Sequence, residues 1–411
     1  MDQTNTNNRS ASVEENVRTA DVQNPSQTTS GYAGTSAAMF DQKQPTEKQL
    51  EYRQKINSMV NSLQPMSAFK EEFVRQCKEY GTRISTGINS LDIVLNGGLS
   101  DELYIMAAET STGKSAFMMN LAQNVARAGS IVLYFALEMS RKEFVARAIS
   151  MISYMYHKED PANAFTAGDV LDWRYEKEDT ASAGIFTKVS YSMYEKYSDE
   201  YFEQYGKNLY IIEGEIEGLS AKDIANICAT MKKRFPMKKI VAFIDYLQLV
   251  KADPDDRSQI DRKTKTDVAV TVFKALASQI GMPVFLLSSV ARGNYGSQIG
   301  TSSFKESGDT EYTGGILIGW NWEGVTNEKD ADARKEEIES CKKRKYRRMT
   351  VDILKYRNAE RDRSVHLRYY PAHNYFEEDV EENKTDSAGN NTDPKQDVVI
   401  RNGREYKVQR S

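Results

Sequence analysis

The sequence contains few residues of the types that build disulfide frameworks or metal centres. Its 411 residues include three cysteines and three histidines. Cys77, Cys228 and Cys341 are far apart and lack C-x-x-C spacing, which argues against a disulfide framework and a zinc site. A run of about 18 apolar residues, which a membrane-spanning helix requires, is also missing. We therefore expect a soluble cytoplasmic protein without a membrane partner.

An excess of positive charge is missing as well. The chain has 55 Lys and Arg residues against 59 Asp and Glu residues, for a formal net charge of −4 at pH 7. It therefore lacks the overall basic character of many nucleic-acid-binding proteins. This argues only weakly against such binding, because a ring of subunits can gather basic loops in a channel while its outer surface stays acidic.

The two ends of the chain differ from its middle. Residues 1–44 are polar and short of large apolar side chains, which predicts a disordered tail. Residues 45–82 have a helical pattern, and Pro65 divides it into two short helices. This segment is either a local cap on the core or an arm that docks on a neighbouring subunit, since periodicity does not reveal what covers an apolar face. Residues 379–411 are read as an acidic linker with a terminal hairpin that turns at Asn402-Gly403.

Residues 83–378 alternate apolar runs with helical patterns, which predicts an α/β fold around a mostly parallel central sheet. Strands are expected at 103–108, 131–137, 209–212, 240–244, 284–288, 315–320, 351–355 and 365–370. Helices are expected at 115–127, 141–155, 221–234 and 266–280.

Two stretches of this region are expected to be elaborations. Residues 157–207 are rich in tyrosine at spacings of three and four, which fits either a half-buried amphipathic helix or a surface that stacks bases. Residues 323–348 are dense in charge and are read as a solvated loop, with contact to phosphates as the alternative.

A phosphate-binding loop is the clearest motif. An apolar run leads into A-E-T-S-T-G-K-S at 108–115, which departs from G-x-x-x-x-G-K-[ST] only at Ala108. Gly113 lets backbone N–H groups approach phosphates, Lys114 reaches the β and γ oxygens, and Ser115 supplies a hydroxyl for Mg²⁺. The strand before and the helix after argue against a chance match. The expected nucleotide contacts are Ala108, Ser111, Thr112, Gly113, Lys114 and Ser115.

Two carboxylates follow strands where a doubly wound sheet presents ligands to a nucleotide. Asp245 ends the run 240–244 and is the candidate Mg²⁺ ligand, with a strand-end cap as the alternative. Glu138 follows the strand 131–137 and is the candidate base that orients and deprotonates an attacking water. With the phosphate loop, they predict a site for ATP and Mg²⁺.

Four further motifs follow the loop in a fixed order. They are F-A-L-E-M at 135–139, I-D-Y-L-Q-L at 244–249, K-E-S-G at 305–308 and K-Y-R-N at 355–358. This order resembles the C-terminal motor domain of DnaB-like replicative helicases, from residue 86 to about 376. Even Ala108 fits, because that family commonly has alanine there.

The resemblance implies a RecA-like P-loop fold that forms hexameric rings around single-stranded DNA and uses ATP hydrolysis to translocate and part the duplex. It assigns Lys114 and Ser115 to phosphate and Mg²⁺, Glu138 to water activation and Asp245 to the metal. Loader or primase proteins would be its further partners.

Lys355 and Arg357 look like the family's pair of cations that reaches into the next subunit's ATP site. Residues two apart on a strand point the same way, so both can address one γ-phosphate. Arg357 would be an arginine finger. Its alternative is a surface cation on an edge strand.

Basic residues in two loops are the candidates for DNA contact. In the family, loops after the Asp245 strand and after the Ser289 strand line the central channel. Cations there would hold phosphates without reading sequence, although solvated loop residues look the same in a sequence. The candidates are Lys251, Arg257, Arg262, Arg292 and Lys305.

The chain departs from the family pattern in three places. Ser289 stands where the family usually has a glutamine that senses the γ-phosphate, so coupling to DNA is altered or another residue such as Arg292 senses it. E-Y-T-G-G at 311–315 replaces an acidic stretch. The N-terminal primase-binding domain has no counterpart of sufficient length before Arg83.

A ring helicase motor accounts best for these motifs. The main alternative is a RecA-fold ATPase that acts as a nucleotide-controlled binding or regulatory module without unwinding activity. A small-molecule kinase shares the phosphate loop but leaves the paired cations Lys355 and Arg357 unexplained.

Overall fold

The computed structural model describes residues 46–79, 83–171, 191–214, 218–253, 261–290, 295–304, 315–325, 330–356, 363–380, 397–401 and 404–408. The chain divides into two units, Met1–Glu71 and Glu72–Ser411. The first contains helix α1 (Glu47–Ser62) and the short helix η1 (Met66–Phe69), and α2 (Lys70–Glu79) follows directly. Pro65 immediately precedes η1, so the predicted break between two helices is confirmed.

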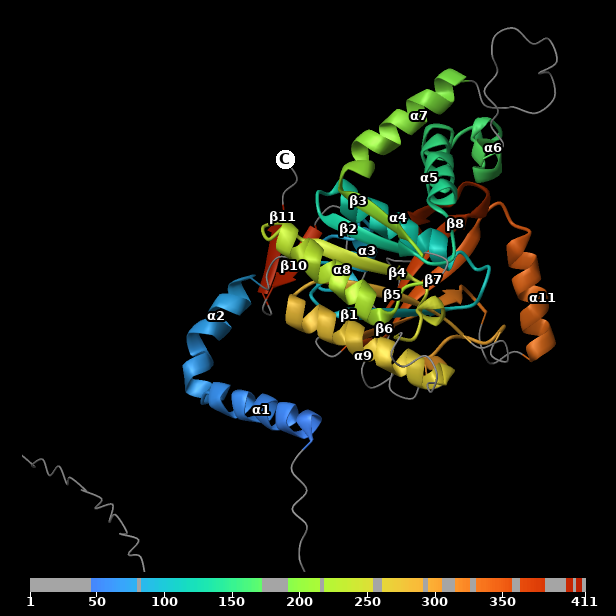
Figure 1. The fold of residues 1–411 in the computed structure, drawn as a ribbon. Coiled ribbons are helices and arrows are strands. Elements are labelled where there is room, and N and C mark those ends of the chain that lie inside the picture. The colour runs from blue at the N-terminus through green and yellow to red at the C-terminus, as the bar shows by residue number, and fades with distance from the viewer. Residues whose placement is uncertain are drawn as a thin grey trace, which may run out of the picture. The chain divides into compact units, whose positions relative to one another are not determined.

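The second unit is built on a nine-stranded sheet (Figure 1). Six neighbouring strands run parallel, and three antiparallel strands extend one edge. The mostly parallel α/β sheet predicted from the sequence is therefore confirmed. In spatial order the strands are β3 (Leu209–Glu213), β2 (Ile131–Ala136), β4 (Ile240–Asp245), β5 (Val284–Ser289), β1 (Leu103–Ala108), β6 (Ile316–Trp322), β7 (Arg347–Tyr356), β8 (Arg363–Tyr370) and β9 (Tyr375–Glu378).

Helices cover both faces of the sheet, because the parallel strands are apolar on both sides. Along β1, Tyr104 and Met106 belong to one core cluster, whereas Leu103 and Ile105 belong to the other. The first cluster includes residues of α3 (Asn89–Val94), α4 (Lys114–Arg127), α5 (Arg141–Tyr156) and α11 (Ala331–Lys342). The second includes residues of α8 (Ala221–Arg234) and α9 (Arg262–Ile280), which Figure 1 shows on the opposite face.

The tyrosine-rich stretch forms a half-buried helix in its described part. On α7 (Tyr191–Gln204) and just beyond it, Tyr197, Tyr201 and Tyr205 are each 2% exposed and belong to a cluster with Ile149 and Ile152 of α5. These three rings are packed inside and are not a surface for stacking bases. The remaining short helices are η2 (Pro161–Asn163), α6 (Ala167–Leu171), η3 (Gly206–Asn208), η4 (Leu247–Leu249), η7 (Thr301–Phe304) and η8 (Pro371–His373).

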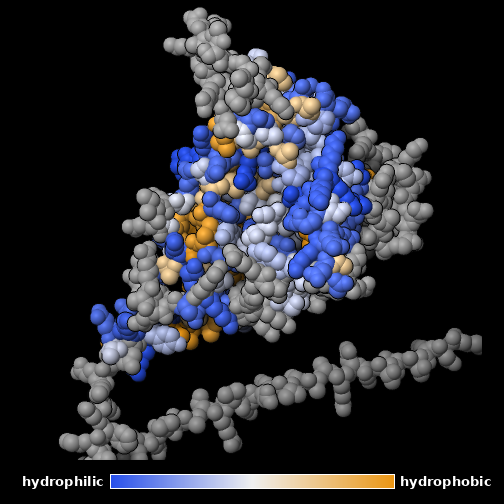
Figure 2. Space-filling view, turned by 90° about the vertical axis from the view of Figure 1, so that its right-hand side faces the viewer, coloured by the Kyte–Doolittle hydropathy of each residue, from blue (hydrophilic) through white to orange (hydrophobic). Residues whose placement is uncertain are grey.

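The interpretation of residues 323–348 as a charged loop was wrong. Asp330 caps α11 by accepting bonds from the amides of Asp332 and Ala333, and Ile338 and Cys341 form its buried stripe. Two apolar positions three residues apart are enough to anchor a helix whose other side chains are charged. Figure 2 turns the side of the molecule that carries α11 in Figure 1 toward the viewer, and its coloured surface there is mainly hydrophilic. Strand β7 also begins within this stretch, at Arg347.

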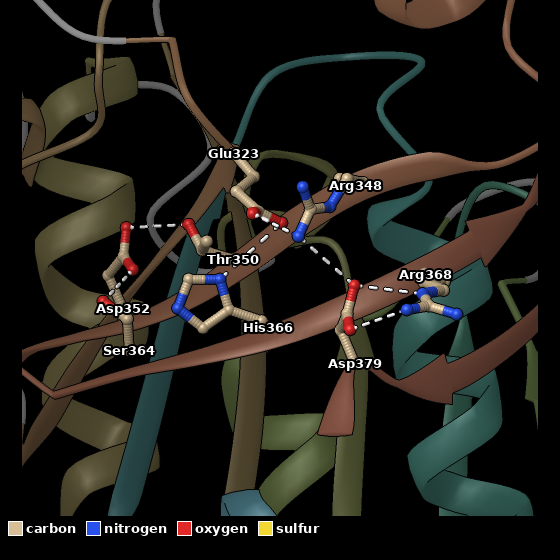
Figure 3. A network of polar contacts seen from close by, with 8 residues as sticks. All are labelled: Glu323, Arg348, Thr350, Asp352, Ser364, His366, Arg368 and Asp379. Atoms are coloured by element: carbon tan, nitrogen blue, oxygen red, sulfur yellow. Dashed lines mark hydrogen bonds and ion pairs between the residues drawn. The ribbon is translucent and has the colours of Figure 1, made fainter. Parts of the chain in front are cut away.

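A polar network fixes the antiparallel end of the sheet (Figure 3). Arg368 makes two bonds to Asp379, at 3.0 and 2.8 Å, and Arg348 bridges Asp379 to Glu323. Burial alone would raise the pKa of Asp379, but hydrogen bonds from Arg368 and the charges of both arginines hold that pKa below its usual value. The network ties β7 and β8 to the chain after β9.

Two features complete the fold. Strands β10 (Asp397–Arg401) and β11 (Arg404–Val408) pair antiparallel on either side of the predicted turn, Asn402-Gly403, which itself lies outside the described residues. Within the described ranges, no helix is both long enough and apolar enough to cross a membrane.

Candidate active site

The predicted phosphate loop connects β1 to α4. Two of its residues have positive φ, Ser111 at 63° and Gly113 at 98°. A Cβ atom on Gly113 would collide with the ring of Tyr369, so a glycine is required here for both backbone and steric reasons. Helix α4 begins at Lys114, and the first amides of a helix have no partner within it. The loop therefore directs a helix N-terminus, which favours anions, at the carboxyl edge of the sheet.

Neighbouring side chains hold the carbonyl groups of the loop. The Thr112 hydroxyl donates to Glu109 O at 2.8 Å, and the Trp320 indole donates to Thr112 O at 3.2 Å. The Arg347 guanidinium donates to Ser111 O at 3.2 Å and lies between the rings of Trp322 and Tyr369. One bond within the loop and two from neighbouring strands thus fix the directions of three loop carbonyls.

Lys114 lies in the mouth of this loop and is only 6% exposed. Its Nζ donates to the Ser289 hydroxyl at 2.9 Å and lies 4.9 Å from the centre of the Tyr246 ring. Ala108 is fully buried at the end of β1 and is paired in register with Ser289. The strand that carries Ser289 is thus the direct neighbour of the phosphate loop.

Asp245 is a fully buried carboxylate at the end of β4. The Ser115 hydroxyl donates to its Oδ1 at 3.2 Å, and the Tyr134 hydroxyl donates to its Oδ2 at 3.0 Å. Burial raises the pKa of Asp245, the two hydroxyl bonds oppose that rise, and the charge of Glu138 adds to it. Its two hydrogen-bond donors are thus neutral hydroxyls, and a cation would stabilise its charged form further.

The donor atoms fit a magnesium ion that also binds phosphate. Mg²⁺ prefers oxygen ligands and usually keeps waters and substrate phosphates in its shell. Ser115 and Asp245 offer a hydroxyl and a carboxylate side by side. Within the described ranges there is no group of three or more His, Cys, Asp or Glu that could hold a metal by itself. Phosphates and waters would therefore supply the remaining ligands.

Glu138 lies at the same edge. It follows β2, whose last residue Ala136 pairs with Asp245, and the amide of Leu137 donates to Asp245 O at 3.0 Å. In contrast to Asp245, the Glu138 side chain is exposed to solvent. The structure thus brings Lys114, Ser115, Asp245 and Glu138 together at one end of three neighbouring elements.

Comparisons with known proteins agree with this geometry. A family model described as the DnaB-like helicase C terminal domain matches residues 83–378. The chain belongs to this family. It is 27% identical over 240 residues to the replicative DNA helicase DnaB of Geobacillus stearothermophilus, which covers 57% of this chain and 46% of that protein. It is 26% identical over 262 residues to DnaB of Pasteurella multocida, covering 62% and 50%. The chain thus spans about half the length of these relatives.

Two solved structures share the fold. One is described as an ATPase domain, with a TM-score of 0.57, 21% identity, and coverage of 75% of this chain and 97% of that one. The other is described as a DnaB-like replicative helicase and its interactions with primase, with a TM-score of 0.56, 20% identity, and coverage of 80% and 74%. The likeness extends over most of the chain and supports the α/β fold described above.

Within this DnaB-like domain, Lys355 lies far from the phosphate loop of its own chain. It pairs with Leu317 near the start of β6, and Leu317 pairs with Ile105 of β1. Three residues of strand separate Ile105 from the end of β1, roughly 10 Å at about 3.3 Å per residue. Lys114 lies beyond the carboxyl ends of the parallel strands, whereas Lys355 lies toward their amino ends.

The other predicted cations are described only in part. Lys251 is exposed and follows η4, after Asp245 on the chain. Arg262 begins α9, but its side chain lies outside the description. The remaining candidates fall outside the described residues: Arg257, Arg292, Lys305 and Arg357.

Sequence reasoning missed three side chains that contact this site. Tyr134 binds Asp245, Gln248 binds Ser289, and Arg347 binds the loop carbonyl of Ser111. Arg347 lies in the charge-dense stretch 323–348, for which contact with phosphates was the alternative interpretation. Tyr134 carried no chemical signal, whereas Gln248 stands in the I-D-Y-L-Q-L motif at 244–249, to which no role was assigned at that residue.

Proposed function

We propose that the chain is an ATP-dependent DNA helicase motor of the DnaB type. It hydrolyses ATP at the subunit interfaces of a homohexameric ring, translocates on single-stranded DNA in the cytoplasm and unwinds duplex DNA during replication. The observation that carries the proposal is the distribution of charge over the sheet. The residues proposed for half an ATP site lie at the carboxyl ends of the parallel strands, and Lys355 lies toward the amino ends.

The residues at the carboxyl ends have distinct tasks. Lys114 and the N-terminus of α4 hold the phosphates of ATP. Ser115 and Asp245 orient the metal, and bound Mg²⁺ would neutralise negative charge on the β- and γ-phosphates. Glu138 accepts the proton of the attacking water, a role that suits an exposed carboxylate beside a buried one.

The position of Lys355 supports completion of the site by a neighbouring subunit. A cation that lies roughly 10 Å back along the strands cannot bind the γ-phosphate held by its own Lys114. In a closed ring with heterologous contacts, two different surfaces of each subunit contact its two neighbours, so a cation remote from its own ATP site can serve the next one. Lys355, with Arg357 two residues further on, would then stabilise the charge that develops during phosphoryl transfer.

Single-stranded DNA is the proposed second substrate. Lys251, which follows η4 and is exposed, would contact its phosphates, together with Arg257, Arg262, Arg292 and Lys305. Loader or primase proteins are proposed as further partners. The solved relative described with primase supports this for the family fold.

ATP hydrolysis measured with and without single-stranded DNA, alongside native mass, tests the proposal. We expect DNA to stimulate hydrolysis and nucleotide to favour a species of about six times the 46.6 kDa chain. A monomer whose hydrolysis ignores DNA would contradict the ring motor. That result would favour the alternative, a RecA-fold ATPase that acts as a nucleotide-controlled binding or regulatory module.

A mixing experiment tests Arg357 directly. Arg357→Ala subunits added to unmodified subunits should depress hydrolysis more than in proportion to their fraction, because each one disables a neighbour's site. Arg234→Ala, which removes an exposed arginine at the end of α8, is the matched control and should have no such effect. A strictly proportional fall with Arg357→Ala would place this arginine outside a shared site.

A further inference from the structure

Gln248 clamps the end of β5 to the segment after β4. Its side-chain Nε2 donates to Ser288 Oγ at 3.1 Å and to Ser289 O at 3.1 Å, and its Oε1 accepts from Ser289 N at 3.2 Å. The amide thus binds the N–H and the C=O of one residue, as a neighbouring strand would. Gln248 itself lies in η4, directly after the strand that ends in Asp245.

The clamped residue also contacts the phosphate loop. The Ser289 hydroxyl accepts the 2.9 Å bond from Lys114 Nζ. A continuous path of hydrogen bonds therefore runs from Lys114 through Ser289 to Gln248. It continues to α9, because Lys265 Nζ donates to Gln248 O at 3.3 Å.

Serine at position 289 cannot reach a γ-phosphate in the way a longer side chain would. In this chain a glutamine amide is nevertheless present at the end of β5, but it comes from η4, which follows the neighbouring strand β4, and it binds the Ser289 main chain. Contact with Lys114 is thus made by the Ser289 side chain, and the strand ends are held together by the Gln248 side chain.

We propose that Gln248 is a positioning residue that links the phosphate site to DNA affinity. Phosphate bound at Lys114 shifts the ends of β4 and β5 through Gln248, and this shift changes the affinity for single-stranded DNA. This inference rests on the function proposed above. A phosphate oxygen is a stronger acceptor for an ammonium group than a hydroxyl is, so bound nucleotide competes with Ser289 for Lys114. Ser289 is then released on one side, while Gln248 makes its main chain move together with η4 and the exposed Lys251 that follows.

The test is the thermodynamic coupling between nucleotide and DNA in the full chain. Fluorescence anisotropy gives the Kd for a labelled oligo-dT strand with and without a non-hydrolysable ATP analogue and Mg²⁺. Coupled sites typically change each other's affinity about 5- to 150-fold. Gln248→Met keeps the length of the side chain but none of its hydrogen bonds. We expect it to bring the ratio of the two Kd values close to one, with the Kd for the nucleotide alone changed less than about threefold.

Matched variants separate this role from general damage. Gln204→Met makes the same substitution on an exposed position of α7 and should retain the wild-type ratio. Ser289→Ala removes the acceptor for Lys114 and should lose the coupling. Ser288→Ala, on the adjacent residue, removes only one of the bonds of Gln248 and should keep most of it.

The outcomes distinguish this inference from the proposed function. If the unmodified chain neither hydrolyses ATP nor couples the two ligands, both fail together. If it couples them and Gln248→Met keeps the full ratio, the role of Gln248 is refuted while the motor stands. Should Gln248→Met not fold, the two serine variants decide, because an unchanged ratio in Ser289→Ala overturns the path through Lys114.

Discussion

Removal of the Tyr134 hydroxyl isolates a single hydrogen bond to a buried carboxyl group. Tyr134 and Asp245 are both fully buried, and the bond between them is 3.0 Å long. A hydrogen bond to a charged group contributes about 1.5–3 kcal/mol. In Tyr134→Phe the ring keeps its contacts with Phe144 and Phe243, so little apolar packing is lost. At a pH where Asp245 is ionised, we expect the free energy of unfolding to fall by about 1.5–3 kcal/mol.

The loss should depend on pH with a defined sign. Burial raises the folded-state pKa of Asp245, so the folded chain holds this proton more tightly than the unfolded chain. The contribution of Asp245 to stability is therefore complete below the unfolded pKa, near 4, and is lost as pH rises through the folded pKa. The Tyr134 bond lowers that pKa, and Tyr134→Phe raises it further. The difference between the two proteins should accordingly shrink toward acid pH.

Urea unfolding of both proteins at pH 8 and pH 5 measures this difference, and Mg²⁺-dependent nucleotide binding gives a second readout. Mutation of residues that orient a metal ligand commonly lowers metal affinity 10- to 100-fold. We therefore expect Tyr134→Phe to need a higher Mg²⁺ concentration for nucleotide binding. Tyr104→Phe is the matched control, because the buried Tyr104 hydroxyl binds the neutral Ser100. Equal stability of Tyr134→Phe and wild type at both pH values would refute the reasoning.

Three further changes test the loop and its support. Gly113→Ala should abolish nucleotide binding in a fluorescence titration, whereas Gly129→Ala, with φ of 94° and open space around it, should only lower stability, by about 1 kcal/mol. Arg347→Gln should weaken nucleotide binding several-fold by freeing Ser111 O, and an unchanged affinity would contradict this. Asp379→Asn should lower the unfolding free energy at pH 7, with the difference from wild type disappearing at acid pH, because the pKa of Asp379 is held below its usual value.

The fold was predictable where local patterns were strong. Strand 103–108 and helix 221–234 have the predicted bounds, because a buried parallel strand is an unbroken apolar run and Ser220 caps the helix with Asp223. The prediction missed α3 and β9, which are six and four residues long. It also missed α11, because two apolar side chains were hidden among charged ones.

The site divides in the same way. Lys114 and Ser115 belong to a local motif, and strand polarity places Asp245 and Glu138 near them. The contacts of Tyr134, Gln248 and Arg347 span 111, 41 and 236 residues of sequence. Such contacts depend on the register between strands, which periodicity alone does not give.

Strand β7 connects the two halves of the proposed ring mechanism. Because it is antiparallel to β6, it starts near the phosphate loop and ends toward the amino ends of the parallel strands. Arg347, at its start, binds the loop carbonyl of its own chain, and Lys355, near its end, lies too far away to do so. The strand spans ten residues, roughly 30 Å at about 3.3 Å per residue. It pairs with β6 along most of its length and with β8 from Arg347 to Ile353, so one strand joins the residue that holds the phosphate loop to the cation that would serve the next site.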